Sequence, residues 1–196
     1  MWRGNETASP GLITATPWGE IITDDLGKTH VITGPGEGKT TAAFGLAMRA
    51  SGHGLKVCII QFMKTGETTG EVIAAKRLKN VEVFQFGTGK FVDPKALTPD
   101  DNVHAREGVD FVKRRLAKGN LDLLILDEVN IASSFGLVDS AEMLKILGSR
   151  GSGIEVVLTG RNAPMDFIES ADYVSIIESR KHPMDKGLKP RKGIEW

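Results

Sequence analysis

Short apolar segments alternate with amphipathic segments over most of this 196-residue chain. The apolar segments are rich in Val, Ile and Leu, and they are apolar at successive positions, so both of their faces should be buried. This pattern is typical of strands in a parallel sheet that helices cover on both sides. We therefore predict strands at residues 30–33, 56–62, 81–86, 121–128, 154–160 and 172–178.

The amphipathic segments carry signals for the beginning and end of helices. Thr98 is a predicted N-cap with Pro99 at the first helical position, and Gly119 ends that helix. Asp139 is predicted to cap another helix. The alternation of strands and helices predicts an α/β domain with right-handed crossovers. The predicted helices cover residues 40–51, 99–118, 140–147 and 163–170.

Length and composition indicate one globular domain. Hydrophobic residues make up 40% of the chain, and the formal net charge is zero, so no charge excess points to nucleic acid or a membrane as partner. No apolar run approaches the about 18 residues of a spanning helix, so we expect a cytoplasmic protein. The single cysteine, Cys58, is predicted to be a small core residue. Residues 1–27 contain Pro10 and Pro17 without periodicity, which predicts an extension, loose or draped over a domain at 28–196.

The segment VITGPGEGKTT, residues 31–41, is a predicted phosphate-binding loop between a strand and a helix. Its glycines let backbone N–H groups approach phosphate oxygens, and the helix N-terminus adds partial positive charge. Lys39 would add a full charge and Thr40 would bind Mg²⁺ through its hydroxyl. The alternative is a glycine-rich turn without phosphate. The predicted nucleotide-binding set is Thr33, Gly34, Pro35, Gly36, Glu37, Gly38, Lys39, Thr40 and Thr41.

Two residues of this loop are unusual. Thr33 stands where the Walker A pattern G-x-x-x-x-G-K-[ST] has its first glycine. Glu37 places negative charge beside a polyphosphate site, and we expect its side chain to point outward.

A carboxylate pair follows another predicted strand, in LDLLILDEVN. A buried strand that ends in Asp127 and Glu128 matches the Walker B pattern, in which a carboxylate holds Mg²⁺ next to the phosphate-loop threonine. In an ordinary ATPase, Glu128 would polarise the attacking water. The alternative is a surface turn after a core strand.

A third strand runs into the turn LTGRNAP, residues 158–164. In a parallel sheet this turn lies at the same carboxyl edge as the other two motifs, so Arg161 should reach the polyphosphate. The alternative is an exposed loop arginine. The basic segment after residue 179 is either a lid or a solvated tail. Together these motifs predict a P-loop NTPase-like (RecA-like) three-layer domain with a mostly parallel sheet of about six strands.

Aromatic residues cluster in VFQFGTGKFVDP, residues 83–94. Phe84 and Phe86 alternate with their neighbours and should share one face of a strand. Phe91 follows the turn, where an apolar residue at the carboxyl edge would line a ligand pocket. The histidines are scattered, and neither a His and Cys metal cluster nor a Ser-His-Asp arrangement is indicated.

Taken together, residues 29–196 resemble the CobA/CobO/BtuR family of P-loop ATP:corrinoid adenosyltransferases. The resemblance rests on TGPGEGKTTAAFGLAMRASGHGLKV, QFMKTGE, LDLLILDEVNIA, VVLTGRNAP and ADYVSIIESRKHPMDKGLKPRKGIEW. It implies that ATP lies in the loop in the sense opposite to that of ordinary P-loop enzymes. A reduced Co(I) corrinoid then attacks the ribose C5′, and inorganic triphosphate leaves. The family has threonine at the position of Thr33.

The resemblance also assigns roles. It implies that Lys39 and Arg161 stabilise the departing triphosphate, that Thr40 and Glu128 contact Mg²⁺ with Asp127 positioning, and that Phe91 forms part of the corrinoid pocket. It further implies a homodimer, and an electron-donor protein is the expected source of the Co(I) state. The family usually has Asn and Lys at the positions of Pro35 and Glu37, and a Trp near Phe91 is missing here.

Two other functions fit part of the pattern. A conventional P-loop NTPase or nucleotide kinase would act at the γ-phosphate, but it has no reason to carry Thr33 or the closing RKHP…GIEW. A non-catalytic module that senses ATP and hands corrinoid to a partner is the third hypothesis.

Overall fold

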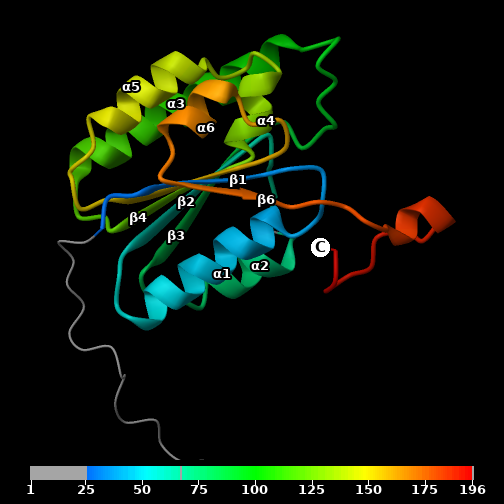
Figure 1. Cartoon of the computed structure of the whole chain (residues 1–196), viewed down its shortest axis with the longest axis horizontal. Helices are drawn as coiled ribbons and strands as arrows, with labels where there is room; N and C mark the ends of the chain where they lie inside the picture. The colour runs from blue at the N-terminus through cyan, green and yellow to red at the C-terminus, as the bar shows by residue number, and fades with distance from the viewer. Residues whose placement is uncertain (1–25, 67, 196) are drawn as a thin grey trace, which may run out of the picture.

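A six-stranded parallel sheet forms the centre of the computed structural model, which describes residues 26–66 and 68–195 (Figure 1). The strand order is β3-β2-β4-β5-β1-β6, so β5 lies between the phosphate-loop strand β1 and the carboxylate strand β4. This confirms the predicted α/β class with a parallel sheet. The strands are β1 (Thr29–Thr33), β2 (Val57–Phe62), β3 (Val81–Phe86), β4 (Leu123–Asp127), β5 (Glu155–Thr159) and β6 (Tyr173–Ile176).

Helices cover both faces of the sheet, which gives the predicted three layers (Figure 1). One face packs against α1 (Lys39–Gly52) and α2 (Gly70–Ala75), where Ala43 and Ala47 meet the apolar side chains of the central strands. The opposite face carries the larger core, in which Phe62, Met143 and Phe167 are fully buried. The helices on that side are α3 (Pro99–Lys118), α4 (Val129–Ser134), α5 (Ser140–Gly148) and α6 (Met165–Ser170).

Burial along the strands follows their place in the sheet. All residues of the central strands β2 and β4 are buried, as their continuous apolar sequences predict. All residues of β6 are exposed, because this strand lies at the edge and pairs only with β1. No residue of β3, the strand at the other edge, is fully buried either. The expectation of burial on both faces is therefore wrong for both edge strands.

The predicted helix caps are confirmed. Thr98 accepts a hydrogen bond from the Asp101 backbone and the Asp101 side chain accepts one from the Thr98 backbone, which makes a capping box. Asp139 accepts a hydrogen bond from the Glu142 backbone at the start of α5. Each cap satisfies a backbone N–H that has no partner inside the helix.

Three short elements were not predicted from the pattern. Helices α2 and α4 and the 3-10 helix η2 (Pro183–Lys186) span only four to six residues each, too few to show a helical period. Helix α4 begins directly after Glu128, which shortens the predicted strand 121–128 to Leu123–Asp127.

Three further predictions concerned Cys58, membrane-spanning helices and the N-terminal extension. Cys58 is completely buried, and desolvation raises the pKa of its thiol to about 12, so it is the predicted core residue. Within the described ranges no helix is long and apolar enough to cross a membrane. Of the predicted extension, residues 1–27, all but Leu26 and Gly27 lie outside the described residues.

Candidate functional site

Three loops that the sequence analysis singled out meet at the carboxyl edge of the sheet. The phosphate loop follows β1, Asp127 ends β4, and Arg161 follows β5. Because all six strands are parallel, these ends lie on the same side. The charges of Arg161 and of both carboxylates act on Lys39, as expected for one shared cluster.

The phosphate loop leads into α1, and no side chain caps the first amides of this helix. Gly38 has φ 100° at the N-cap position and provides no side chain to bind the amides of the first turn. The Lys39 ammonium curls back over the loop, and its Nζ donates to the carbonyl oxygens of Gly34 at 2.9 Å and Gly36 at 2.5 Å. Burial and then Arg161 lower the pKa of Lys39. Uncapped amides and a poised cation form a site for an anion.

Gly34 and Gly36 leave room for a neighbouring segment of the chain as well as for a ligand. The chain after β6 passes so close that a Cβ on Gly34 would lie 2.4 Å from the Ile177 carbonyl oxygen. A Cβ on Gly36 would lie 2.7 Å from Glu178. The Gly36 N–H also donates to the Ile177 carbonyl at 2.8 Å. The C-terminal segment is thus part of the loop's wall.

Glu37 and Thr33 connect the loop to other elements. Glu37 is half-exposed, as expected, but its carboxylate also lies 2.6 Å from His182 Nε2 on the C-terminal segment. The Thr33 hydroxyl accepts a hydrogen bond from the Ala163 N–H at 3.2 Å, which joins the loop to the turn after β5. Thr41 is exposed on α1.

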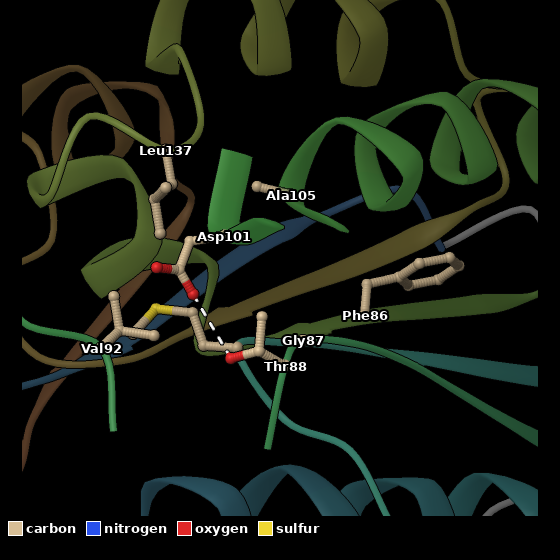
Figure 2. Close-up of a pocket in the computed structure, with 8 residues that line it drawn as sticks. Phe86, Gly87, Thr88, Val92, Asp101, Ala105 and Leu137 are labelled. Atoms are coloured by element: carbon tan, nitrogen blue, oxygen red, sulfur yellow. Dashed lines mark hydrogen bonds between the residues drawn. The ribbon is translucent and has the colours of Figure 1, made fainter. Parts of the chain in front are cut away.

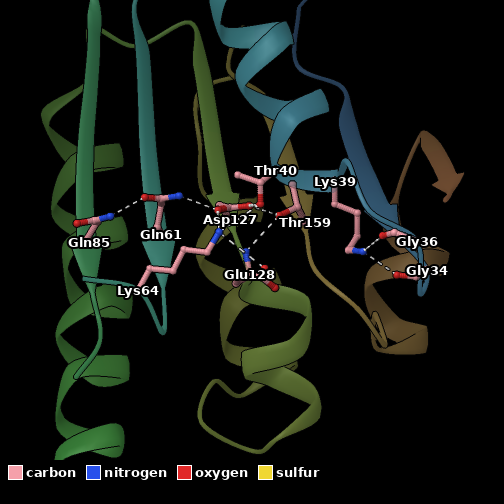
Figure 3. A network of polar contacts seen from close by, with 10 residues as sticks. All are labelled: Gly34, Gly36, Lys39, Thr40, Gln61, Lys64, Gln85, Asp127, Glu128 and Thr159. Carbon is pink, nitrogen blue, oxygen red and sulfur yellow. Dashed lines mark hydrogen bonds and ion pairs between the residues drawn. The ribbon is translucent and has the colours of Figure 1, made fainter. Parts of the chain in front are cut away.

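Asp127 is the centre of a buried network of polar contacts (Figure 3). Its side chain is completely buried. One of its oxygens accepts from the Thr159 hydroxyl at 2.6 Å and the Thr40 hydroxyl at 3.0 Å. The other accepts from Gln61 Nε2 and Lys64 Nζ, both at 2.8 Å. Burial alone raises the pKa of Asp127, but Lys64 and these hydrogen bonds outweigh it and hold the pKa below its ordinary value.

Lys64 is the main site residue that sequence reasoning missed. Its Nζ lies 2.8 Å from Asp127 Oδ2, 3.2 Å from Thr40 Oγ1 and 3.8 Å from Glu128 Oε1. Burial lowers the pKa of Lys64, but the charges of Asp127 and Glu128 more than offset it, so the pKa is raised. Its ammonium is therefore a cation held among three oxygens.

Three further polar residues support the network. Gln85 Nε2 donates to Gln61 Oε1 at 2.9 Å, which fixes the Gln61 amide that binds Asp127. Thr159 accepts from the Glu128 N–H at 3.1 Å while it donates to Asp127. Each of these residues is a polar exception in a mainly apolar strand, and that was the signal that could have identified them.

Glu128 turns away from the strand. Its backbone is left-handed, with φ 62°, and it caps α4 without a side-chain bond of its own. Its side chain is 26% exposed at the edge of the cluster. Burial raises the pKa of Glu128, with Lys64 acting in the opposite direction. The carboxylate is therefore open to a ligand, whereas that of Asp127 is enclosed.

The oxygen ligands suit Mg²⁺. Thr40, Asp127 and Glu128 offer hard oxygen donors, and the Lys64 ammonium shows that a cation is already stable among them. No group of three or more His, Cys, Asp or Glu side chains that could hold a metal occurs in the part of the chain that the structure describes. Mg²⁺ usually binds one or two carboxylates and completes its coordination with water and phosphate, so a small set fits.

A broad depression lies beside the loop. It has a volume of about 600 Å³ and is lined by the loop and by the turn after β5. This volume falls within the usual range for small-molecule sites. The predicted Arg161 contributes to the same wall as the predicted loop residues. The lining residues are Thr33, Gly34, Pro35, Arg161, Asn162, Ala163 and Ile168.

The aromatic segment after β3 differs in part from expectation. Phe84 and Phe86 share one face, because both pack against Phe111. Phe91, expected to line a pocket, is 94% exposed, and its neighbour Val92 lines a small crevice instead (Figure 2). That crevice holds only about 10 Å³, room for no more than one water. The backbone here turns Val92 inward and leaves Phe91 at the surface.

Comparisons with known proteins agree with this geometry. A family model described as ATP:corrinoid adenosyltransferase BtuR/CobO/CobP matches residues 25–196. The corrinoid adenosyltransferase of Escherichia coli strain K12 is 37% identical over 173 residues, which cover 88% of this chain and 87% of that protein. That of Pseudomonas aeruginosa strain PAO1 is 34% identical over 174 residues, 88% of this chain and 85% of that protein. Corrinoid adenosyltransferase CobA of Salmonella typhimurium strain LT2 is 34% identical over 173 residues, 88% and 87% of the two chains.

Proposed function

The chain belongs to the BtuR/CobO/CobP family of ATP:corrinoid adenosyltransferases, and from this premise we propose how its residues carry out the reaction. It is an enzyme that adenosylates corrinoids. The observation that carries the proposal is the meeting of the uncapped α1 amides, Lys39 and the carboxylate pair at one edge of the sheet. These groups suit a triphosphate and its Mg²⁺.

In the proposed reaction, the Co(I) centre of the reduced corrinoid substrate attacks C5′ of ATP. The electron pair of Co(I) forms the Co–C bond, and the C5′–O bond breaks with its electrons going to oxygen. Inorganic triphosphate leaves, and the adenosylcorrinoid is the product. No proton is removed from the nucleophile, so no general base is required. The enzyme must hold C5′ in line and stabilise the charge that develops on triphosphate.

The phosphate loop and Arg161 are proposed to stabilise that charge. The backbone N–H groups at the start of α1 point a partial positive charge at the anion. Within the loop, Pro35 has no N–H and the Gly36 N–H is bound to Ile177, so the remaining N–H groups between Gly34 and Thr40 are assigned to the phosphates. Lys39 exchanges its carbonyl partners for phosphate oxygens, and its burial makes the charge more effective. Arg161 lies on the wall of the adjoining depression, where its planar fork suits phosphate.

Thr40, Asp127 and Glu128 are proposed to hold Mg²⁺. When bound, Mg²⁺ would neutralise charge on the triphosphate oxygens. Glu128 is the more exposed carboxylate and is assigned the direct contact. Asp127 is fully committed to four donors, so it positions Thr40 and the network around it.

The corrinoid is proposed to bind outside the enclosed crevice, which is too small for it. Phe91, exposed at the carboxyl edge, remains the proposed apolar wall that excludes a lower axial ligand and favours reduction of cobalt. We further propose a cytoplasmic homodimer that receives electrons from a donor protein. The family resemblance supports the dimer, and the chemistry of Co(I) supports the donor.

A spectroscopic assay tests this function. The protein is mixed with MgATP and chemically reduced cobalamin in the dark, and the Co(I) absorption is followed. Its loss, with formation of a light-sensitive Co–C product, is expected. Consumption of ATP without any change in the corrinoid spectrum would instead indicate a conventional NTPase.

A further inference from the structure

Lys64 occupies the position at which a cation is expected, among the oxygens assigned to Mg²⁺ (Figure 3). Its Nζ contacts Asp127 Oδ2 at 2.8 Å and Thr40 Oγ1 at 3.2 Å, and it lies 3.8 Å from Glu128 Oε1. These are the same three side chains that the proposed metal site uses. An ammonium and a divalent ion cannot share the same small set of oxygens, because like charges repel strongly at such separations.

We infer that Lys64 is an exchangeable counter-ion that couples Mg²⁺ binding to triphosphate binding. Its ammonium and Mg²⁺ compete for Thr40 and the carboxylates, and the displaced ammonium then binds the triphosphate. This inference deepens the proposed function and rests on the proposed metal site.

The competition follows from charge balance. Asp127 is completely buried, and a buried carboxylate without a partner would be costly. Thr40, Thr159 and Gln61 donate hydrogen bonds to it, but among the residues that the structure describes only Lys64 adds a full positive charge in direct contact. Mg²⁺ held by Thr40 and Glu128 beside Asp127 would supply that charge in place of Lys64. The ammonium thus lowers the affinity for the metal and balances the charge of Asp127 until the metal binds.

The surroundings of Lys64 allow it to move. It lies two residues past the end of β2, after Met63, whose backbone is left-handed with φ 58°. Thr65 and Gly66, which follow, are exposed. Asp127, by contrast, is held by hydrogen bonds from three other residues and stays in place. Once Mg²⁺ neutralises Asp127 and Glu128, the bound triphosphate would be the most highly charged anion beside Lys64, and Lys64 would add a third cation to Lys39 and Arg161.

Manganese binding without nucleotide tests the competition. Mn²⁺ replaces Mg²⁺ as the probe, and free Mn²⁺ is measured by electron paramagnetic resonance. Lys64→Met removes the charge and keeps most of the length, so it should bind Mn²⁺ about tenfold more tightly than the wild type, from the loss of a charged competitor. Lys64→Arg should bind it no more tightly. Lys113→Met is the matched control, because Lys113 Nζ also lies 2.8 Å from a carboxylate oxygen, that of Glu142, away from the site.

Triphosphate binding tests the second part of the inference, that the displaced Lys64 ammonium binds the triphosphate. With saturating Mg²⁺, Lys64→Met should bind inorganic triphosphate about tenfold more weakly than the wild type and Lys113→Met. Unchanged Mn²⁺ affinity or unchanged triphosphate affinity in Lys64→Met would overturn the inference. Glu128→Gln distinguishes a failure of the proposed metal site from a failure of the role assigned to Lys64. If Glu128→Gln weakens Mn²⁺ binding while Lys64→Met leaves Mn²⁺ binding unchanged, the metal site is supported and the role of Lys64 is refuted. If it has no effect, the site and the inference fall together.

A measurement on the wild-type protein does not depend on any variant folding. A lysine-acetylating reagent is applied briefly, and modification of Lys64 is quantified by peptide mass spectrometry. Mg²⁺ alone should increase acetylation of Lys64, and Mg²⁺ with triphosphate should reduce it again, while Lys113 stays constant. No increase with Mg²⁺ would contradict displacement of the ammonium.

Discussion

The carboxylate of Glu37 lies 2.6 Å from Nε2 of His182, so the tip of the phosphate loop is joined to the C-terminal segment. This ion pair adds to the backbone hydrogen bond between Gly36 and Ile177. His182 thus gives the Glu37 carboxylate a partner beside the proposed anion site. The pair is half-exposed, so it orients the segment more than it stabilises the fold.

Removing the Glu37–His182 ion pair should make the C-terminal segment more mobile. In Glu37→Gln the charge is lost and the length is kept, so trypsin should cut within residues 180–192 faster than in the wild type. The free energy of unfolding should change by less than about 1 kcal/mol. Limited proteolysis with mass spectrometry measures the cleavage. Glu107→Gln is the control, since it breaks an exposed pair with a histidine, His104, outside the C-terminal segment. Equal cleavage in both variants would show that the Glu37–His182 pair does not hold the segment.

Thr159 should be important for stability, because its hydroxyl serves two partners. Thr159→Val leaves the Glu128 N–H without its acceptor and Asp127 without its shortest donor. The free energy of unfolding, measured by chemical denaturation, should fall by about 1–3 kcal/mol. Thr88→Val is the control. The Thr88 hydroxyl makes only long contacts, 3.3 Å to Asp101 and 3.4 Å from the Lys90 N–H, so its loss should cost less than about 0.5 kcal/mol. An equal loss in both variants would mean that the Asp127 network contributes no more to the free energy of unfolding than the contacts of Thr88.

Glu128 should make the protein less stable as pH rises. Burial raises its pKa in the folded state, so between the ordinary glutamate pKa and neutrality the unfolded chain ionises more readily than the folded one. That difference costs stability as pH increases through this range. Glu128→Gln removes it, so without Mg²⁺ the variant should match the wild type near pH 4 and exceed it at pH 7. Urea unfolding at several pH values measures this, and a variant that is less stable at pH 7 would reverse the assignment.

Phe91 should matter for cobalt reduction without mattering for the fold. Its side chain is 94% exposed, so Phe91→Ala should change the free energy of unfolding by less than about 0.5 kcal/mol. Turnover from Co(II) should fall more than turnover from pre-reduced Co(I). Val92→Ala is the comparison, because Val92 is buried and its loss should lower the free energy of unfolding by about 1 kcal/mol or more. Equal effects of Phe91→Ala on both starting states would remove it from the redox step.

Much of the fold could be predicted from local sequence. The apolar segments located the strands, and Thr98 and Asp139 located helix starts, because burial and capping act through neighbouring residues. The exposure of β6 could not be predicted in this way, since it depends on which strand lies at the edge. The short helix after Glu128 also escaped, because a left-handed residue there has no sequence signature.

The site was predictable only where a motif carries its own chemistry. Lys39 and the carboxylate pair were found because glycine-rich loops and acidic strand ends have known uses. Lys64 and Gln61 were missed, because their roles come from the order β3-β2-β4, which sets them beside Asp127. A buried glutamine in an apolar strand was the available hint.

The phosphorus product of ATP tests the central claim most directly. Wild type and Lys39→Ala are incubated with MgATP and pre-reduced cobalamin, and the products are identified by phosphorus nuclear magnetic resonance. We predict inorganic triphosphate in the wild type, formed in step with the adenosylated corrinoid, and a rate at least about 100-fold lower in Lys39→Ala. ADP and phosphate as the products, or near-normal triphosphate release by Lys39→Ala, would contradict the account.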